Sequence, residues 1–462
     1  MRFDILHSFT DRPVAIDDSG NSLDGAQFGK FCEQFAQLIP PRSLIFIECK
    51  NGCEALAGFL ACLELRIVPL LIDHKMDSGL KSGLVKTYRP AFIWKPEAKN
   101  VESSDVLLSW HEYNLYKTGH ETPELHEDLS LLLTTSGSTG SPKLVRHSYR
   151  NVYKNAVNVA KAFSITKYDR PLVFLPMQYT MGLSLVCSHL MAGATVHLTD
   201  RPITDSVFWK RLKDEQITNI TGVPFSFVWF KKLRLERMDL PHLKVLSQGG
   251  GKLEDELFKA FADFCAKHNK KFIASYGQTE STARMSVLDP EMALQKAGSI
   301  GKAIPEGAFS IRLDDGSISK EGEARGELVY EGPNVTLGYA YSHEDLMNPD
   351  ERRGVLSTGD IARRDADGFY YIEGRMSRFL KIYGIRISMD EVESLVAGKY
   401  ETDCAVIGRD DEMRILIAGN KDEKEVRSYV SEVLHLNHAA ISVSAVDEIK
   451  RNSAGKIMYT EN

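Results

Sequence analysis

The sequence predicts an α/β fold: a large N-terminal domain of αβ sheets with a small β-barrel-like module, followed by a small C-terminal α+β domain. Three observations support this fold class. Short β-branched runs alternate with helical patterns along most of the 462 residues, as at 43–48, 51–65 and 68–73. From about residue 300 the pattern changes to short strands between Gly and Asp turns. After Arg375 a further αβ stretch follows.

The alternating region repeats the order strand, helix, strand, which is typical of parallel or mixed sheets covered by helices. A short apolar run bounded by turn residues predicts a buried strand, and an apolar stripe with a period of 3.6 residues predicts a helix. The strands predicted in this region are 43–48, 68–73, 171–175, 193–198, 217–222, 243–247 and 271–275.

The later region predicts two modules. Its first strands, separated by Gly and Asp turns, indicate an antiparallel or barrel-like module. These strands are 308–316, 326–332 and 367–375. Farther on, Ser388 with Glu391 three residues later forms a capping-box pattern that opens a helix. We therefore divide the chain into a large domain, 1–375, and a small mobile domain, 376–462.

The composition excludes several classes of protein. The net charge is −6, from 57 basic and 63 acidic residues, so no basic surplus is present to hold nucleic acid. The seven cysteines include no CxxC pair, which favours reduced thiols packed as small apolar groups. No stretch approaches the roughly 20 apolar residues that span a bilayer, and the first residues lack a signal-peptide run. We therefore expect a cytoplasmic protein without a membrane span.

A loop rich in hydroxyl groups and glycine predicts a phosphate site. The glycines let backbone N–H groups approach anionic oxygens, the hydroxyls donate further hydrogen bonds, and the lysine supplies a positive charge. The loop is not a Walker A motif, because Pro142 stands where that motif needs glycine. A plain Ser/Gly surface turn is the alternative, and the Pro-Lys ending favours phosphate binding. The loop consists of Thr135, Ser136, Gly137, Ser138, Thr139, Gly140, Ser141, Pro142 and Lys143.

Five ordered segments resemble the adenylate-forming superfamily, which includes acyl-CoA synthetases, adenylation domains of peptide synthetases, and luciferases. They are TSGSTGSPK (135–143), SYGQTE (275–280), STGDIARRDADGFYYIEGR (357–375), KIYGIRISMDEVE (381–393) and NSAGK (452–456). The resemblance implies an enzyme that uses ATP and Mg²⁺ to activate a carboxylic acid as acyl-AMP. It then implies transfer of the acyl group to a pantetheine thiol, with CoA as the expected acceptor. The chain is most similar in pattern to a short bacterial acyl- or aryl-CoA ligase.

The resemblance also implies which residues handle the phosphates. The 135–143 loop would hold the β- and γ-phosphates, with Lys143 pairing with their charge. Thr279 would bond the α-phosphate, and Glu280 would ligate Mg²⁺, a task that suits one hard carboxylate when phosphates supply other oxygens. Lys456, on a compact turn, would bridge the substrate carboxylate and the α-phosphate. These four residues are the predicted catalytic set.

The nucleoside contacts follow from the same resemblance. Adenine would lie against Tyr276, and Asp360 would accept hydrogen bonds from both ribose hydroxyls. Arg375 would contact ribose and phosphate. The plainer interpretations are a core aromatic for Tyr276, a turn residue for Asp360 and a solvated arginine for Arg375. The remaining predicted adenine-site residues, by backbone or by motif, are Gly249, Gly250, Ser275 and Gly277.

The acid pocket is predicted beside the nucleotide, along 179–184, 222–227 and 247–251. Thr180 stands where peptide-synthetase relatives carry an aspartate for the substrate's amino group. An unpaired buried ammonium is costly, so α-amino acids are disfavoured and a fatty or aromatic acid is expected. The pocket residues we select are Tyr179, Gly182, Phe225 and Gly251.

The second half-reaction is expected to follow rotation of the small domain. Gly384 would then border the thiol channel, where a missing side chain leaves room for a pantetheine arm. The hinge position, often Asp or Lys in relatives, is Ser377. One mobile domain that serves two reactions is a gating mechanism.

Three alternatives remain beside the CoA ligase. A stand-alone adenylating enzyme would load the phosphopantetheine of an acyl carrier protein. A nucleotide-binding regulatory protein would have lost catalysis, which the retained Lys143, Glu280, Asp360 and Lys456 argue against. A Rossmann oxidoreductase is disfavoured, because no GxGxxG follows a strand.

Overall fold

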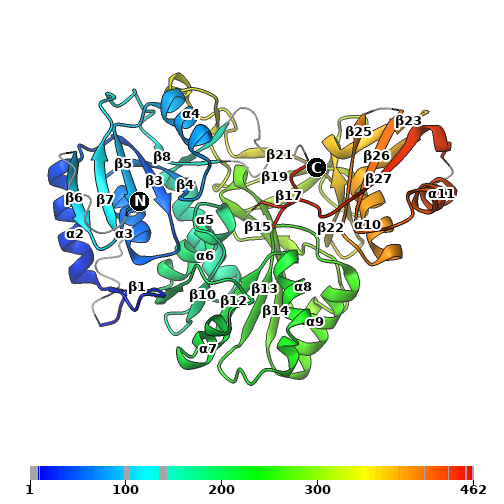
Figure 1. Ribbon diagram of the computed structural model, residues 1–462, viewed down its shortest axis with the longest axis horizontal. Helices are drawn as coiled ribbons and strands as arrows, with labels where there is room; N and C mark the ends of the chain where they lie inside the picture. Colours follow the sequence, from blue (N-terminus) through cyan, green and yellow to red (C-terminus); the bar gives the residue numbers. More distant parts are fainter. Residues whose placement is uncertain are drawn as a thin grey trace. The chain divides into compact units, whose positions relative to one another are not determined.

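The computed structural model describes residues 9, 11–97, 105–134, 143–383, 385–409, 411–434, 436–452 and 455–459, with the backbone alone at 377, 379, 381, 385 and 386. The chain forms two compact units (Figure 1). The first comprises Met1–Ala308 with Tyr330–Leu356, and the second comprises Phe309–Val329 with Ser357–Asn462.

A nine-stranded mixed sheet lies in the first unit. Its strands are β1 (Ala15–Ile16), β2 (Ser22–Leu23), β10 (Pro171–Val173), β11 (Val196–Leu198), β12 (Asn219–Gly222), β13 (Val245–Gln248), β14 (Lys271–Gln278), β15 (Ala283–Leu288) and β16 (Lys302–Ala303). Their order is β16-β15-β14-β13-β12-β10-β11-β1-β2. The strands from β14 to β1 are parallel, whereas β15, β16 and β2 pair antiparallel at the edges.

An eight-stranded mixed sheet lies in the same unit. Its strands are β3 (Leu44–Cys49), β4 (Val68–Asp73), β5 (Phe92–Pro96), β6 (Val106–Trp110), β7 (Tyr113–Lys117), β8 (Leu129–Thr134), β9 (Leu144–Ser148) and β20 (Gly338–Ala340). Their order is β20-β9-β8-β4-β3-β5-β7-β6. The four central strands β8, β4, β3 and β5 are parallel. Every residue of β3 is buried, because both faces of the sheet are covered there.

Two helices, α5 (Tyr149–Ala162) and α6 (Thr180–Met191), lie between these sheets (Figure 1). Helix α5 contacts β8, β9 and β15, and α6 contacts β10, β11 and β15. Ser148 caps α5, because its hydroxyl accepts a hydrogen bond from the Asn151 N–H at 3.1 Å. Apolar side chains from both helices and both sheets form one core. Among the described residues, the other helices of this unit are α2 (Gly25–Leu38), α3 (Cys53–Glu64), α4 (Ser78–Tyr88), α7 (Ser206–Asp214), α8 (Pro224–Lys232), α9 (Asp255–Lys267), η1 (Leu235–Arg237), η2 (Thr279–Ser281), η3 (Pro290–Met292) and η4 (Glu344–Met347).

The second unit combines a five-stranded sheet, a hairpin and a three-stranded sheet. The five-stranded order is β18-β17-β19-β21-β22, the hairpin pairs β23 with β24, and the last sheet is β25-β26-β27. The elements are β17 (Ala308–Arg312), β18 (Ile318–Ser319), β19 (Ala324–Glu331), β21 (Val355–Arg364), β22 (Tyr370–Arg375), η5 (Met376–Arg378), β23 (Phe379–Ile382), β24 (Ile385–Ser388), α10 (Met389–Tyr400), β25 (Cys404–Arg409), β26 (Glu412–Ala418), α11 (Glu423–Leu434), η6 (His438–Ala440) and β27 (Ile441–Val446).

The predicted fold class is confirmed. The predicted strand 68–73 coincides with β4, and the Ser388 hydroxyl caps α10 by accepting from the Glu391 N–H at 3.3 Å. The predicted domain division at 375–376 concerns movement between two catalytic states. The second compact unit groups strands β17, β18, β19, β21 and β22 with the C-terminal residues. This grouping does not test the movement, so the division at 375–376 stays a prediction.

The state of the cysteines and the length of the helices relate to the predicted reducing compartment and to the predicted lack of a membrane span. All seven cysteines are free and buried. Burial raises the pKa of the Cys32 thiol to about 12, which keeps it protonated and unreactive. Within the described parts of the chain, no helix is long and apolar enough to cross a membrane.

Candidate active site

The predicted acid and nucleotide segments follow four neighbouring parallel strands. Strands β10, β12, β13 and β14 are adjacent in the sheet, and their carboxyl ends therefore meet at one edge. Ligands of open α/β sheets bind at this edge. The segments that begin there are 175–180, 223–227, 249–251 and 275–280.

The glycine segment after β13 brings α6 against β14. A side chain at Gly249 would lie 2.4 Å from the Met181 Cε atom and 2.9 Å from the Ser275 hydroxyl, so a larger residue would require these side chains to shift. Gly250 has a φ of +81°, a backbone conformation that glycine adopts without strain. Ser275 donates to the Gln248 carbonyl at 3.1 Å. This part of the predicted adenine site is therefore closely packed.

Gly277 serves the fold as well as the predicted nucleotide site. A Cβ atom there would lie 1.5 Å from the Ala283 carbonyl oxygen, at the register shift between β14 and β15. Such a bulge redirects the side chains beside it. Next to it, the Gln278 amide donates to the Tyr276 hydroxyl at 3.2 Å.

Thr279 joins the nucleotide segment to the acid segment. Its hydroxyl lies 3.1 Å from the hydroxyl of Thr180, the first residue of α6. The predicted α-phosphate ligand and the predicted acid segment are therefore in direct contact.

Glu280 is held by three residues from outside its own segment. The Tyr339 hydroxyl donates to the Glu280 Oε1 atom at 2.7 Å. The Glu280 carbonyl accepts from the Thr336 N–H at 3.0 Å, from the Thr336 hydroxyl at 2.9 Å and from Arg352 at 3.4 Å. The carboxylate is therefore oriented before any ligand binds.

Tyr339 and Arg352 are site residues that sequence reasoning missed. The Tyr339 ring lies between two cations, with the Lys143 Nζ atom 4.1 Å and the Arg352 guanidinium 4.5 Å from its centroid. Burial and the neighbouring Glu280 raise the pKa of Tyr339, so the hydroxyl stays protonated and donates. No motif spacing relates position 339 to position 143 or 352, and the proximity of Tyr339 to Lys143 arises from the pairing of β9 with β20.

The donor set around Glu280 fits a magnesium ion that is bound mainly by ATP. Within the described residues, no group of three or more His, Cys, Asp or Glu side chains gathers as an all-protein metal site. Mg²⁺ in nucleotide sites takes one or two carboxylates plus phosphate oxygens and water. Glu280 would hold the ion, and the ion would neutralise phosphate charge.

Two of the predicted acid-pocket residues lie at the start of α6, and the other two lie on α8 and after β13. Tyr179 is the N-cap residue of α6, and a side chain at Gly182 would lie 2.4 Å from the Pro176 carbonyl oxygen, so Gly182 lets α6 pack on the preceding loop. Phe225 on α8 is 43% exposed, and Gly251 lies against Pro224.

Phe227, within the predicted 222–227 lining, belongs instead to the core. It is fully buried and packs against Phe261 and Phe272 at ring distances of 5.0 and 5.8 Å. Phe225 and Phe227 lie on different faces of α8, so one is exposed and the other is buried. The apolar sequence alone does not distinguish the two.

The second unit holds the predicted ribose residues side by side. Asp360 on β21 is paired in register with Arg375 on β22, and the Arg375 Nε atom lies 3.3 Å from the Asp360 Oδ1 atom. Asp360 is only 2% exposed, and its N–H donates to the Thr358 hydroxyl at 3.1 Å. Arg375 therefore orients the carboxylate that is predicted to accept from ribose.

Lys456 lies on a compact turn, as expected. The Asn452 N–H donates to the Lys456 carbonyl and the Lys456 N–H donates to the Asn452 side chain, both at 2.9 Å. Arg451 and Ile457 form an antiparallel bridge across the turn. Lys456, Asp360 and Arg375 belong to the second unit, whereas Lys143, Thr279 and Glu280 belong to the first.

Several predicted residues lie outside the described ones. They are Thr135, Ser136, Gly137, Ser138, Thr139 and Gly140 of the phosphate loop, and Gly384 of the thiol channel. The loop connects β8 to β9, which pair from Thr134 with Leu144. Only the backbone of Ser377 is described, within η5.

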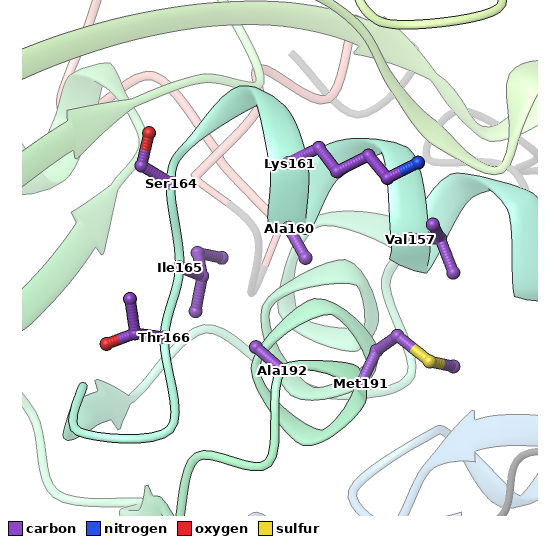
Figure 2. A pocket seen from close by; sticks show the side chains of 8 residues that line it. All are labelled: Val157, Ala160, Lys161, Ser164, Ile165, Thr166, Met191 and Ala192. Carbon is purple, nitrogen blue, oxygen red and sulfur yellow. The ribbon is translucent and has the colours of Figure 1, made fainter.

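A shallow hollow of about 420 Å³ lies away from all these residues. Figure 2 shows its lining, from the end of α5, the following loop and the end of α6. Val157, Ile165 and Met191 line it, and no predicted site residue does. The hollow is therefore not the acid pocket.

Comparison with known proteins identifies the family. The family model of AMP-binding enzymes matches residues 5–340. This chain belongs to the AMP-binding enzyme family. The 2-succinylbenzoate–CoA ligase of Bacillus licheniformis is 30% identical over 430 residues, which cover 88% of this chain and 86% of the relative. The feruloyl-CoA synthase of an Amycolatopsis species is 29% identical over 80% of this chain and 74% of the relative.

The fold of the family is the fold described above. The O-succinylbenzoate CoA synthetase of Bacillus subtilis, in complex with ATP and magnesium ion, superposes with a TM-score of 0.80 at 23% identity over 99% of this chain and 98% of that chain. The predicted enzyme class, an AMP-forming acid–CoA ligase that uses ATP and CoA, is confirmed by the family. Use of magnesium stays a prediction. The roles of individual residues stay predictions.

Proposed function

We propose that this enzyme activates an aromatic carboxylic acid and transfers it to CoA, and that the acid binds between the first turn of α6 and the carboxyl ends of β12 and β13. One observation carries the proposal: the Thr180 hydroxyl contacts the Thr279 hydroxyl at 3.1 Å. An acid carboxylate beside Thr180 would thus lie next to the predicted α-phosphate ligand. The two named relatives act on aromatic acids, which supports this substrate class.

The first step must bring two anions together. Lys143, Glu280 with its magnesium ion, and Lys456 would neutralise the phosphates and the carboxylate, which repel each other. Tyr339 supports this arrangement, because it contacts both Lys143 and Glu280. The Thr180 hydroxyl offers no negative charge for an α-ammonium group, so amino acids are not expected substrates.

The second step would use rotation at Ser377, which brings Gly384 to the thiol. The contacts of Arg378 support a hinge directly before it. Its guanidinium lies 2.5 Å from both Asp390 and Glu393 of α10 and 3.8 Å from the centroid of the Tyr459 ring. Arg378 is therefore the first residue after the hinge that is locked into the C-terminal core.

We propose that this chain transfers the acyl group to CoA alone and does not load a carrier protein, and that it works in the cytoplasm. CoA is named in both relatives, and seven free cysteines suit a reducing compartment. A carrier protein remains the alternative acceptor that the assay below separates.

The test is exchange of labelled pyrophosphate into ATP with aromatic and fatty acids, followed by thioester formation with CoA or a holo carrier protein. We expect exchange with aromatic acids and thioester with CoA. Exchange with fatty acids alone would contradict the substrate class, and transfer to the carrier protein alone would contradict the acceptor. Failure with every acid would favour a nucleotide-binding protein without catalysis.

Lys456→Ala tests the division of labour between the two steps. We expect adenylation to fall by about 10²–10³-fold, because one charge-stabilising contact is lost. Thioester formation from supplied acyl-adenylate should persist near the wild-type rate. Equal loss of both steps would contradict the proposed role of Lys456.

A further inference from the structure

Arg378 connects the predicted hinge to the C-terminal core. Its guanidinium pairs with Asp390 and Glu393 of α10 and donates to the Val406 carbonyl of β25 at 3.0 Å. The same group lies over the Tyr459 ring, 3.8 Å from its centroid. Only 12% of the Arg378 side chain is exposed. Arg378 is therefore held by ion pairs, a hydrogen bond and a ring contact at once.

Tyr459 is held through both its ring and its hydroxyl group. The ring lies under Arg378, and the hydroxyl donates to the Glu393 Oε2 atom at 3.1 Å. The other carboxylate oxygen, Glu393 Oε1, accepts from Arg378 at 2.5 Å and from the Val406 N–H at 2.7 Å. Burial and the nearby Glu393 raise the pKa of Tyr459, so its hydroxyl stays protonated and donates. Arg378, Glu393 and Tyr459 therefore form one cluster, which we call the hinge clamp.

The hinge clamp lies close to Lys456 along the chain, because Tyr459 follows Lys456 by three residues. Between them, Ile457 forms an antiparallel bridge with Arg451 across the lysine turn. Ile457 and Tyr459 both pack against a small group of buried apolar side chains, namely Ala405, Leu416 and Ile449. The segment 457–459 therefore fastens the end of the lysine turn to the core.

A second contact, between Arg451 and Asp403, fastens the start of the turn more weakly. The Arg451 Nη2 atom lies 3.1 Å from the Asp403 Oδ1 atom, and 55% of the Asp403 side chain is exposed. Exposed ion pairs stabilise little, because water and salt screen their charges. The paired side chains of Arg378 and Glu393 are only 12% and 14% exposed. We therefore expect the hinge clamp to fix the turn more firmly than this ion pair does.

We propose that Tyr459 is a positioning residue for Lys456, and that the hinge clamp makes the lysine turn move together with the residue after the hinge. The inference rests on the function proposed above, in which Lys456 bridges the substrate carboxylate and the α-phosphate. Because the hinge clamp joins Arg378 to Tyr459, rotation at residue 377 would set the position of Lys456 without slack between them.

Adenylation would depend on this precision. A displacement of about 1 Å in a reacting group can lower a rate by about 100-fold. Without the hinge clamp, the lysine turn would swing relative to the hinge, and the ammonium group would reach the phosphate less often. Thioester formation is expected after Lys456 has left the site, so it would not depend on the hinge clamp. Loss of the clamp should therefore affect the two half-reactions differently.

Two variants weaken the hinge clamp in steps. Tyr459→Phe removes the hydroxyl but keeps the ring beside Arg378, whereas Tyr459→Leu removes both contacts. Both variants keep the ion pairs of Arg378, so neither leaves a buried charge unpaired. The matched control is Tyr429→Phe, at a partly buried tyrosine of α11 whose ring centroid lies 5.9 Å from that of Tyr400.

The measurements are pyrophosphate exchange and thioester formation from supplied acyl-adenylate and CoA. Tyr459→Phe should slow exchange about fivefold and Tyr459→Leu about 50–100-fold. Thioester formation should stay within about twofold of the wild-type rate in both variants, which also shows that they are folded. Tyr429→Phe should behave as wild type in both half-reactions.

The Lys456→Ala background shows whether the effect of Tyr459 passes through Lys456. Residues that act as one unit give non-additive losses when both are changed. Once Lys456 is alanine, Tyr459→Leu should therefore slow exchange further by less than about twofold. A full additional loss in the double variant would overturn the inference, because Tyr459 would then act on adenylation without Lys456.

Other results would also overturn the inference. Equal loss of both half-reactions in Tyr459→Leu would make the hinge clamp purely structural. Wild-type exchange in Tyr459→Leu would mean that the turn keeps its position without the clamp. Wild-type exchange in Lys456→Ala would instead reject the proposed role of Lys456, and no exchange by the wild-type enzyme with any acid would reject the proposed function; this inference would fall with either.

Discussion

Glu280 and Arg284 lie four residues apart, yet their charged side chains have very different numbers of polar partners. The Glu280 carboxylate accepts a hydrogen bond from Tyr339, and two cations flank that tyrosine. Arg284 is buried more deeply and has one hydroxyl partner. The carboxylate predicted to serve ATP is therefore surrounded by polar partners, whereas the buried guanidinium has a single polar partner among the described residues.

Glu54 shows a third way to bury an ionisable group. Burial, with a further contribution from nearby Asp17, raises its pKa to about 7, although a backbone hydrogen bond opposes the shift. A glutamate can thus become neutral, whereas an arginine with a pKa of about 10 cannot. The buried arginine therefore keeps a charge that costs stability, whereas the buried glutamate can lose its charge.

The largest effect on activity should come from removing the carboxylate of Glu280. Glu280→Gln removes the charge that would hold magnesium while keeping a similar shape. We expect pyrophosphate exchange to fall by about 10²–10³-fold, with a higher magnesium requirement. The control is Glu291→Gln, which changes an exposed carboxylate near the site in sequence. Wild-type magnesium dependence in Glu280→Gln would contradict the assignment.

The contrast between these residues also marks what sequence can predict. Glu280 was predicted because it lies in SYGQTE, a contiguous motif whose chemistry is local. The strand pattern predicted β4 and the helix cap at Ser388, since periodicity and capping also act over a few residues. Tyr339 reaches Glu280 only through the pairing of β20 with β9, which no local pattern encodes.

Arg284 illustrates the same limit, because its burial could not be predicted from the sequence. In ARMSVL it resembles any polar residue of a strand with one face in solvent, and its burial depends on α5 and α6 packing over β15. Phe225 and Phe227 differ for a similar reason, since tertiary packing buries one and exposes the other. Residue type was therefore insufficient wherever distant elements decide the environment.

Glu54→Gln should stabilise the enzyme at alkaline pH. The folded-state pKa is raised from 4.5 to about 7, so the stability of the wild type is fully present below pH 4.5 and declines as pH rises through 7. The neutral glutamine avoids that loss, which amounts to about 3 kcal/mol at most above pH 7. Asn21 donates to Glu54 at 3.2 Å, and an amide oxygen can still accept this hydrogen bond.

Urea unfolding at pH 5 and pH 8 checks this prediction. The variant should exceed the wild type at pH 8 and approach it at pH 5. Glu33→Gln, at an exposed position of α2, provides the comparison. An equal difference between variant and wild type at both pH values would show that titration of Glu54 is not the cause.

Arg284→Met should stabilise the enzyme in the absence of substrate. Replacing a buried charge that lacks a partner by an apolar side chain removes its desolvation cost, and we expect a gain of about 2 kcal/mol. Urea unfolding without substrate measures the gain. A substantial loss of stability without substrate would mean that the chain itself compensates the charge.

The smallest effect on activity should come from removing the hydrogen bond that Tyr339 donates to Glu280. Tyr339→Phe removes the hydroxyl that donates to the carboxylate but keeps the ring between Lys143 and Arg352. We expect exchange to slow by about 5–10-fold, since one hydrogen bond to a charged group is lost while the carboxylate itself remains. Tyr341→Phe, at a residue 58% exposed, is the matched control. A positioning role requires the apparent magnesium affinity to fall in Tyr339→Phe alone, and a change in both variants would assign the effect to the strand rather than to the hydroxyl.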